Sequence, residues 1–478
     1  MSAIVVFATD KGDIKMKKTE LQELKKKLCY KKENVFDVRT KKDEKALEEY
    51  SREYMSFLDK AKTEREAVKE GIKMLEANGF VPYTLGGKIK KGGKYYYNNR
   101  DKSLFAFTAG TESIENGIRI CAAHIDSPRL DLKQHPMFEN EGFAYLKTHY
   151  YGGIRKYQWV TIPLALHGVV TKADGTNVEI TIGEDENDPI FCITDLLPHL
   201  AREQSQKPLG TAHSGESLNL LIGSQPIDGD IDEKVKLNML KILNDKYGIV
   251  ESDFVSAELI ATPAGKAREL GLDRSFIAAY GHDDRVCSYP ALTSIIECKD
   301  SAHTLMCVLA DKEEIGSEGV SGMKCRLIVD LIEEISKQLG GNPNVVRANS
   351  MCLSADVSAG YDPMYPDVYE KRNSAIVNCG VVMNKYTGGG GKSSTNDASA
   401  EYVGFIRKIF EENKITWQTA ELGKIDVGGG GTVAMYIANQ NINTVDLGVP
   451  VLSMHAPLEV IAKNDLYETH KAFVAFCK

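Results

Sequence analysis

The chain has 478 residues, a net charge of −8 and an ordinary share of hydrophobic residues, 42%. The length predicts more than one domain, and the acidic balance argues against nucleic acid or an anionic membrane as a partner. No apolar run reaches the roughly 18–20 residues of a membrane-spanning helix. The N-terminus has no basic segment ahead of a long apolar core, so no secretory signal is predicted. The ten cysteines occur without a CxxC pair, and a reducing cytoplasm is the expected location.

Residues 13–80 are rich in Lys and Glu and are expected to be mostly helical. The stretch "KKDEKALEEYSREYMSFLDKAKTEREAVKEGIKMLEANGF" has apolar residues at helical spacing and ends in "NG", a common helix stop. The lysine run at 15–32 is interleaved with acids nearby, which favours a solvated helix face over a basic binding patch.

From about residue 118 the pattern changes to short apolar runs. Each run shows little alternation, which is typical of strands in a sheet covered on both faces. Helical stretches such as "VSGMKCRLIVDLIEEISKQLG" separate the runs, so we expect an α/β fold with a largely parallel core sheet. The five runs are "GIRICAAHIDS" (117–127), "SFIAAYGHDD" (275–284), "HTLMCVLADKEEIGS" (303–317), "NSMCLSADVSAG" (349–360) and "NTVDLGVPVLSMHAPLE" (443–459).

Residues 132–262 follow a different pattern. "YGGIRKYQWVTIPLALHGVVTKADGTNVEITIGED" alternates polar and apolar residues around a "DG" turn, which predicts a β-hairpin. We therefore expect a mainly β module at 132–262, inserted into a discontinuous α/β domain made of residues 1–131 and 263–478.

Each of the five apolar runs ends in an acid or an imidazole. In an open α/β sheet, ligands bind beyond the carboxyl ends of the strands, so these side chains are expected to converge. Two imidazoles and three carboxylates are too many for one tetrahedral zinc ion but suit two ions if one carboxylate bridges them. Zinc, cobalt and manganese all suit such ligands. The five candidate ligands are His124, Asp283, Glu314, Asp356 and His455.

Two further carboxylates have separate predicted roles. Glu313 and Glu314 are adjacent, so their side chains point in different directions, and Glu313 is free to act as the general base on a metal-activated water. Asp126 follows His124 by two residues and is expected to orient its imidazole by accepting the other ring N–H. A lone histidine or a "DKEE" turn is usually structural. The prediction of a metal site therefore rests on five candidate ligands that each follow an apolar run.

Two glycine runs, at 388–391 and 428–431, suggest a rival function. "TGGGGKSS" resembles a phosphate-binding loop, but the spacing G-x-x-x-x-G-K-S is not met. "VGGGGTVAMYIA" could begin a dinucleotide-binding helix, but Val433 occupies the third glycine position. Both runs are more consistent with backbone flexibility or with close backbone approach near a substrate. No HExxH or GxSxG motif is present in the sequence.

The ordered motifs resemble those of the M18 family of metalloaminopeptidases, the aspartyl aminopeptidase group. The resemblance spans roughly residues 80–478 and implies a zinc-exopeptidase α/β domain, a mixed sheet flanked by helices, interrupted by a β-rich dimerisation domain. It also implies a homo-oligomer, in which dimers assemble into a dodecamer that encloses the active sites. The motifs are "AAHIDSPRLDLK", "GHDDRVCSYPAL", "ADKEEIGSEG", "LSADVSAGYDP", "KSSTNDASAE" and "SMHAPLE".

The resemblance also implies how the ligands are shared. His124, Asp283 and Asp356 would hold one metal, and Asp283, Glu314 and His455 the other, with Asp283 as the bridge and Glu313 as the base. The family usually has "LDN" where this chain has His282-Asp283-Asp284, so Asp284 remains an alternative bridge.

Two more residues are assigned by the same resemblance. The family uses a lysine before the "TN" pair to recognise an acidic substrate side chain, and Lys385 fits that position better than Lys392. It also takes a histidine from the inserted domain of a neighbouring subunit, and His199 lies in the corresponding region.

The predicted function is a cytoplasmic enzyme with two Zn²⁺ ions that removes the N-terminal residue from peptides, with metal-bound hydroxide as nucleophile and Glu313 as base. An acidic N-terminal residue is the preference that the resemblance suggests. One alternative is a metal-dependent N-acyl-amino-acid deacylase or amide hydrolase, which shares the site chemistry. Another is a nucleotide-binding protein that uses the glycine runs.

Overall fold

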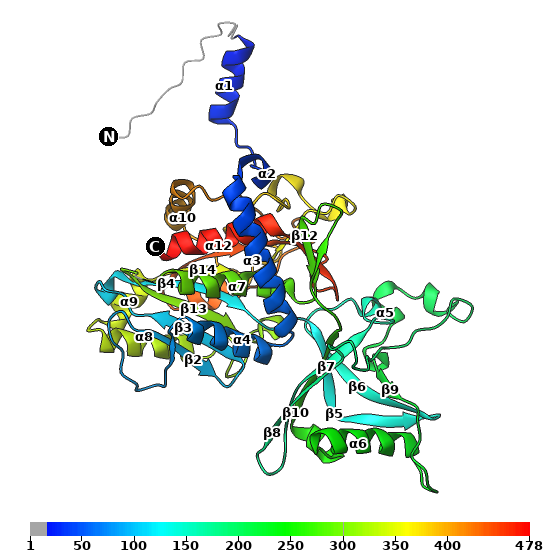
Figure 1. Cartoon of the computed structure of the whole chain (residues 1–478). Coiled ribbons are helices and arrows are strands. Elements are labelled where there is room, and N and C mark those ends of the chain that lie inside the picture. The colour runs from blue at the N-terminus through cyan, green and yellow to red at the C-terminus, as the bar shows by residue number, and fades with distance from the viewer. Residues whose placement is uncertain (1–16, 300) are drawn as a thin grey trace.

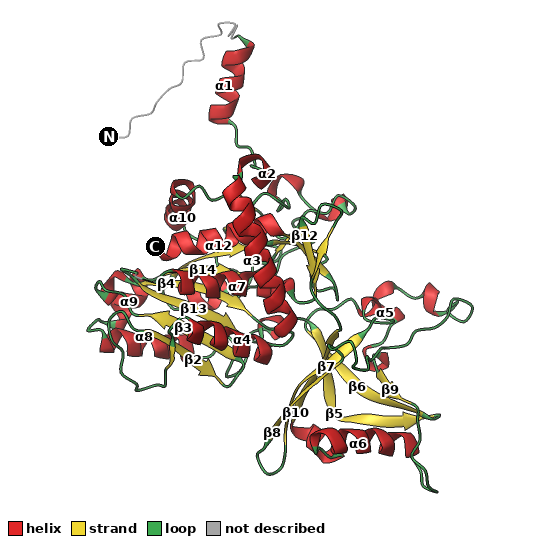
Figure 2. Ribbon diagram, in the orientation of Figure 1, coloured by secondary structure: helices red, strands yellow, loops and turns green. Residues whose placement is uncertain are grey.

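The computed structural model describes residues 17–299 and 301–478. Residues 1–16, on which the prediction of no secretory signal rests, lie outside the described part. The described strands form three sheets of nine, six and five strands, with helices packed around the largest (Figures 1 and 2). Within the described ranges, no helix combines the length and the apolar character that crossing a membrane requires.

The nine-stranded sheet is mixed, with parallel strands at its centre. The four central strands, in the order β13, β4, β14 and β18, are all mutually parallel, whereas β3 and β16 flank them in the antiparallel sense. This arrangement confirms the mixed, helix-flanked α/β fold class. The strands are β1 (Val81–Pro82), β2 (Lys94–Asn99), β3 (Ser103–Thr108), β4 (Ile118–His124), β13 (Thr304–Ala310), β14 (Met351–Ala355), β16 (Val381–Asn384), β17 (Trp417–Thr419) and β18 (Asn443–Gly448).

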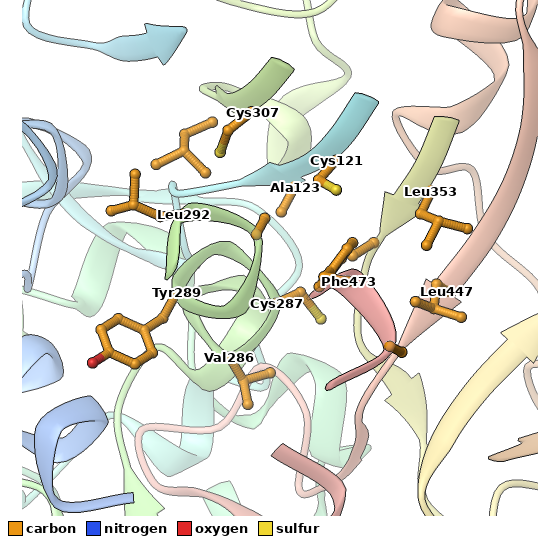
Figure 3. Close-up of a cluster of buried hydrophobic side chains, with 14 of the residues drawn as sticks. Cys121, Ala123, Val286, Cys287, Tyr289, Leu292, Cys307, Leu353, Leu447 and Phe473 are labelled. Carbon is orange, nitrogen blue, oxygen red and sulfur yellow. The ribbon is translucent and has the colours of Figure 1, made fainter. Parts of the chain in front are cut away.

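Helices cover both faces of this sheet, as the unbroken apolar runs predict. In β4, Cys121 and Ala123 pack against one set of helices, while Ile120 and Ala122 pack against the other. Figure 3 shows the first set, where α7 and α12 lie against β4. On that side are α3 (Lys41–Lys60), α4 (Glu64–Ala77), α7 (His282–Glu297), α10 (Ala400–Glu412) and α12 (Lys463–Cys477); on the other are α8 (Leu327–Gln338), α9 (Pro343–Asn349) and α11 (Ala434–Ala438).

The N-terminal region is helical, as expected. Thr40 and Thr63 begin α3 and α4 with capping boxes, in which each hydroxyl accepts a backbone N–H three residues on. Two helices precede them, α1 (Lys18–Leu28) and α2 (Val35–Val38). No residue of α1 is buried, so the part of the lysine run within this helix is a solvated helix face.

The six-stranded sheet is antiparallel throughout and stands apart from the central sheet in Figure 1. The predicted hairpin is present: β7 and β8 pair from Leu166–Ile182 to Thr171–Asn177, and the "DG" turn joins them. α6 packs against one face of the sheet. The elements are β5 (Arg129–Asn140), β6 (Phe143–Tyr151), β7 (Leu164–Thr171), β8 (Asn177–Ile182), α5 (Leu209–Ala212), β9 (Leu220–Gly223), α6 (Lys234–Tyr247) and β10 (Ala257–Pro263).

The five-stranded sheet was not predicted. The runs at 275–284 and 443–459 were expected to supply strands to one core sheet. The second run does supply β18 to that sheet, but β12 and β19 belong to this smaller sheet. Their apolar segments are three or four residues long, too short for periodicity to indicate which sheet they join. The strands are β11 (Arg268–Leu270), β12 (Phe276–Ala279), β15 (Ser358–Ala359), β19 (Pro450–Leu452) and β20 (Glu459–Ala462).

Candidate metal centre

The five predicted ligands converge from two sheets. His124 is the last residue of β4, Glu314 lies in the turn after β13, and Asp356 directly follows β14. These three strands are parallel neighbours, so their carboxyl ends meet. The other two ligands follow strands of the five-stranded sheet: Asp283 after β12, at the start of α7, and His455 after β19. The five side chains therefore converge, although they come from two sheets and not from one.

Asp283 lies between the two imidazoles. Its Oδ1 is 3.2 Å from His124 Nε2, and its Oδ2 is 3.1 Å from His455 Nε2. Asp284, the alternative bridge, reaches the His124 side: its Oδ2 accepts the main-chain N–H of His124 at 3.3 Å. A carboxylate oxygen of Asp284 also lies within 4.8 Å of ligand atoms of His124 and Asp356. Asp283 differs from it in facing both imidazoles, as a bridging carboxylate would.

The distances from the two imidazoles to the other two carboxylate ligands are similar. His124 Nε2 is 3.6 Å from Asp356 Oδ1, and His455 Nε2 is 3.5 Å from Glu314 Oε1. Two atoms bonded to one tetrahedral zinc ion at about 2.0–2.1 Å lie roughly 3.3 Å apart. The observed separations fit two zinc ions that share Asp283.

Three of the facing atoms are buried without a hydrogen-bond partner. They are His124 Nε2, Asp283 Oδ1 and Glu314 Oε1. Buried polar atoms are normally paired, because leaving one unpaired costs about 1–3 kcal/mol. Two divalent cations would satisfy all three atoms, so the donor set fits metal ions.

The electrostatics of the cluster also fit a cation. Burial and the nearby carboxylate of Asp356 raise the pKa of Glu313 to about 8, and burial and Asp283 raise the pKa of Glu314 well above its usual value. Although burial opposes it, Asp283 and Glu314 raise the pKa of His455 to about 10. Crowded carboxylates disfavour one another's ionisation, and two divalent cations would offset that repulsion.

Glu313 faces the same space from the turn after β13. Its Oε2 is 3.9 Å from His124 Nε2, the longest of the carboxylate distances to that atom. Ligand atoms of His124, Glu313 and Glu314 all lie within 4.8 Å of one another. Glu313 is therefore close enough to act on a water molecule held at the centre.

Asp126 contacts both the first histidine and the glutamate turn. Its Oδ1 lies 3.3 Å from His124 Nδ1, whose N–H also reaches the main-chain oxygen of Asp126 at 3.0 Å. The same carboxylate accepts the main-chain N–H groups of Glu313 and Glu314 at 3.1 and 3.2 Å. Asp126 thus makes the contact with His124 that the spacing predicts, and it also fixes the turn.

Sequence reasoning missed two buried residues at the centre. Glu459 accepts the main-chain N–H groups of Asp283 at 3.0 Å and His455 at 2.7 Å, and Tyr151 donates its hydroxyl to Asp126 at 2.8 Å. Glu459 is the last residue of the motif "SMHAPLE", which was a signal. The position of Tyr151 depends on how the inserted sheet folds back, and no local pattern indicates that.

The two residues assigned to substrate recognition lie elsewhere in this chain. Lys385 follows β16, is partly exposed and forms an ion pair with Asp397, which also pairs with Lys392 at 3.1 Å. His199 is exposed in the long loop between β8 and β9. Within residues 17–299 and 301–478, neither side chain has a hydrogen bond or ion pair to the five ligands.

The glycine runs contact each other. The N–H of Gly388 donates to the carbonyl of Gly430 at 2.7 Å, and a side chain on Gly429 would collide with the carbonyl of Gly388. The two runs therefore approach each other closely, as glycine allows. A cavity of about 190 Å³ lies beside them, lined in part by Lys392 and Lys424.

A partly buried cluster of two histidines and three carboxylates, at the ends of strands from two sheets, is typical of metal-dependent hydrolases. The profile of the family described as "Aminopeptidase I zinc metalloprotease (M18)" matches residues 57–477. The chain belongs to this M18 family and is a zinc metalloaminopeptidase.

Individual relatives agree. The chain is 48% identical to a probable M18 family aminopeptidase 1 of Clostridium acetobutylicum, over 91% of this chain and 96% of the relative. The corresponding protein of Thermotoga maritima is 44% identical, over 92% and 98%. The crystal structure of an M18 aminopeptidase from Thermotoga maritima matches with a TM-score of 0.90 at 43% identity, covering 94% of this chain and 99% of that one. These matches do not favour the deacylase or the nucleotide-binding alternative.

Proposed function

We propose that the centre holds two zinc ions per chain, or cobalt or manganese in their place, and removes the N-terminal residue from peptides. His124, Asp283 and Asp356 would hold one ion, and Asp283, Glu314 and His455 the other. The position of the Asp283 carboxylate between two imidazoles carries the proposal, because its two oxygens face different histidines. When bound, the ions polarise the scissile carbonyl and lower the pKa of a shared water.

The side chains of the chain perform the remaining steps. Glu313 takes the proton of the attacking water and passes it to the leaving nitrogen. A pKa near 8 would let a carboxyl exchange protons near neutral pH, and bound cations would lower it by attraction. Asp126 holds His124 and the glutamate turn in place during both transfers.

Activity on free-amine substrates tests this function. After removal of metal and reconstitution with Zn²⁺, Co²⁺ or Mn²⁺, the protein should hydrolyse fluorogenic aminoacyl substrates, and metal analysis should find two ions per chain. N-acetylated substrates should remain intact. Hydrolysis of N-blocked substrates alone would support the deacylase instead, and stabilisation by ATP without bound metal would support nucleotide binding.

The proposed preference for acidic N-terminal residues depends on Lys385. Replacing it by alanine should lower kcat/KM for N-terminal Asp or Glu about 10–100-fold, because a hydrogen bond to a charged group contributes about 1.5–3 kcal/mol, and should leave neutral substrates unaffected. Lys392→Ala is the matched control, since both lysines pair with Asp397 and both have 44% exposed side chains. A larger loss in the control would move the specificity role to Lys392.

We further propose that the β-rich module mediates assembly into a homo-oligomer and that His199 reaches the active site of a neighbouring subunit. A fold relative from Saccharomyces cerevisiae at 22% identity is described as a dodecamer, and His199 lies on an exposed loop. A cytoplasmic location fits the cysteines, all ten of which are free.

A further inference from the structure

One strand of the inserted sheet ends beside the metal centre. β6 ends at Tyr151, and Gly152 and Gly153 follow it directly. Tyr151 is buried, with 8% of its surface exposed. This three-residue segment contacts Asp126 and lies against two of the proposed ligands, Glu314 and His455.

The hydroxyl of Tyr151 completes the hydrogen bonding of Asp126. It donates to Asp126 Oδ2 at 2.8 Å, the same oxygen that accepts the N–H of Glu314 at 3.2 Å. Asp126 Oδ1 accepts the N–H of Glu313 at 3.1 Å. The carboxylate therefore has donors on both oxygens, and these hydrogen bonds fix its plane relative to the imidazole of His124.

The ring of Tyr151 is itself held in place. The guanidinium of Arg129 lies 4.0 Å from the ring centre, a cation–π contact. Arg129 Nη1 pairs with the buried Glu64 at 2.8 Å. Because Arg129 is held by its ion pair with Glu64, the hydroxyl of Tyr151 has little freedom to leave Asp126.

The following two residues approach the other proposed zinc site. The carbonyl of Gly153 accepts the Nδ1–H of His455 at 2.7 Å, which leaves Nε2 to face Asp283. Gly152 has φ of +72°, and a Cβ there would lie 3.0 Å from Glu314 Oε2. The segment thus packs closely against Glu314, and a side chain at Gly152 would require Glu314 to shift.

We propose that Tyr151 is a positioning residue, contributed by the inserted sheet, that fixes Asp126 and through it His124 and the turn carrying Glu313 and Glu314. The inference rests on the proposed two-zinc centre. Groups that orient metal ligands in this way typically contribute 10–100-fold to metal affinity or activity.

Tyr151→Phe removes the hydroxyl alone and tests the role. Zinc affinity, measured by competition with a chromogenic chelator, should fall about tenfold, and kcat should fall with little change in KM. The absorption spectrum of the Co²⁺-substituted protein should shift, because the ligand geometry changes. The matched control is Tyr402→Phe, whose buried hydroxyl donates to the main-chain carbonyl of Cys352 at 2.9 Å; it should lose similar thermal stability but keep wild-type zinc affinity.

A double-mutant cycle separates positioning from a general packing effect. In an Asp126→Asn background, Tyr151→Phe should cause little further loss of zinc affinity. The reason is that Tyr151 acts through the carboxylate of Asp126, which this background has already lost. Unchanged affinity in Tyr151→Phe, a loss equal to that of the control, or full additivity with Asp126→Asn would overturn the proposal. Wild-type protein that binds no zinc would instead refute the proposed centre itself, and the two failures are therefore distinguishable.

Discussion

Asp283→Asn is expected to abolish the two-metal centre and to lower kcat/KM by at least about 10³-fold, because the centre supplies several kcal/mol of transition-state stabilisation. An amide has one oxygen and one N–H₂ group, so it can serve one cation but cannot bridge two. The two Nε2 atoms that face Asp283 would lose their shared anionic partner. Metal analysis of the purified variant should find at most one zinc ion per chain.

Asp284→Asn is the matched control for this variant. It makes the same change one residue along, at a carboxylate that contacts the His124 main chain. It should retain two zinc ions per chain. If Asp284→Asn loses metal while Asp283→Asn keeps both ions, the bridge is Asp284.

Glu313→Gln is expected to keep both zinc ions and to lose about 10²–10⁴-fold in kcat, the usual contribution of a positioned general base. Glutamine has the shape of glutamate but cannot accept the proton of the attacking water. The side chain lies 3.9 Å from His124 Nε2, close enough to serve the centre without being required to hold a cation. Steady-state kinetics and metal content should be measured on one preparation.

Glu318→Gln provides the comparison for Glu313→Gln. Glu318 is near in sequence, but its side chain is 73% exposed and pairs with Lys324. This variant should retain wild-type activity, as surface ion pairs contribute little. Zinc loss in Glu313→Gln would identify Glu313 as a ligand, and near wild-type turnover with intact zinc would exclude it as the base.

The candidate ligands could be predicted because each follows a strand. His124, Glu314 and Asp356 end apolar runs that became neighbouring parallel strands, and the rule for open α/β sheets then brings them together. The hairpin around the "DG" turn was equally local, since turn chemistry and alternation both lie within a few residues. Asp283 and His455 were identified correctly as converging residues although their strands belong to another sheet.

Two of the contacts around the ligands were not predicted. Tyr151 meets Asp126, and Glu459 meets Asp283, only because β6 and β20 turn back toward the central sheet, and pairing between distant segments leaves no periodic signal in either. The five-stranded sheet was missed for the same reason. The sequence of a short strand does not indicate which strand it pairs with.

The distribution of the ligands over two sheets has a consequence for folding. His124 ends β4 of the nine-stranded sheet, whereas His455 follows β19 of the five-stranded sheet. A folding intermediate in which only one of these sheets has formed would therefore lack part of the proposed centre.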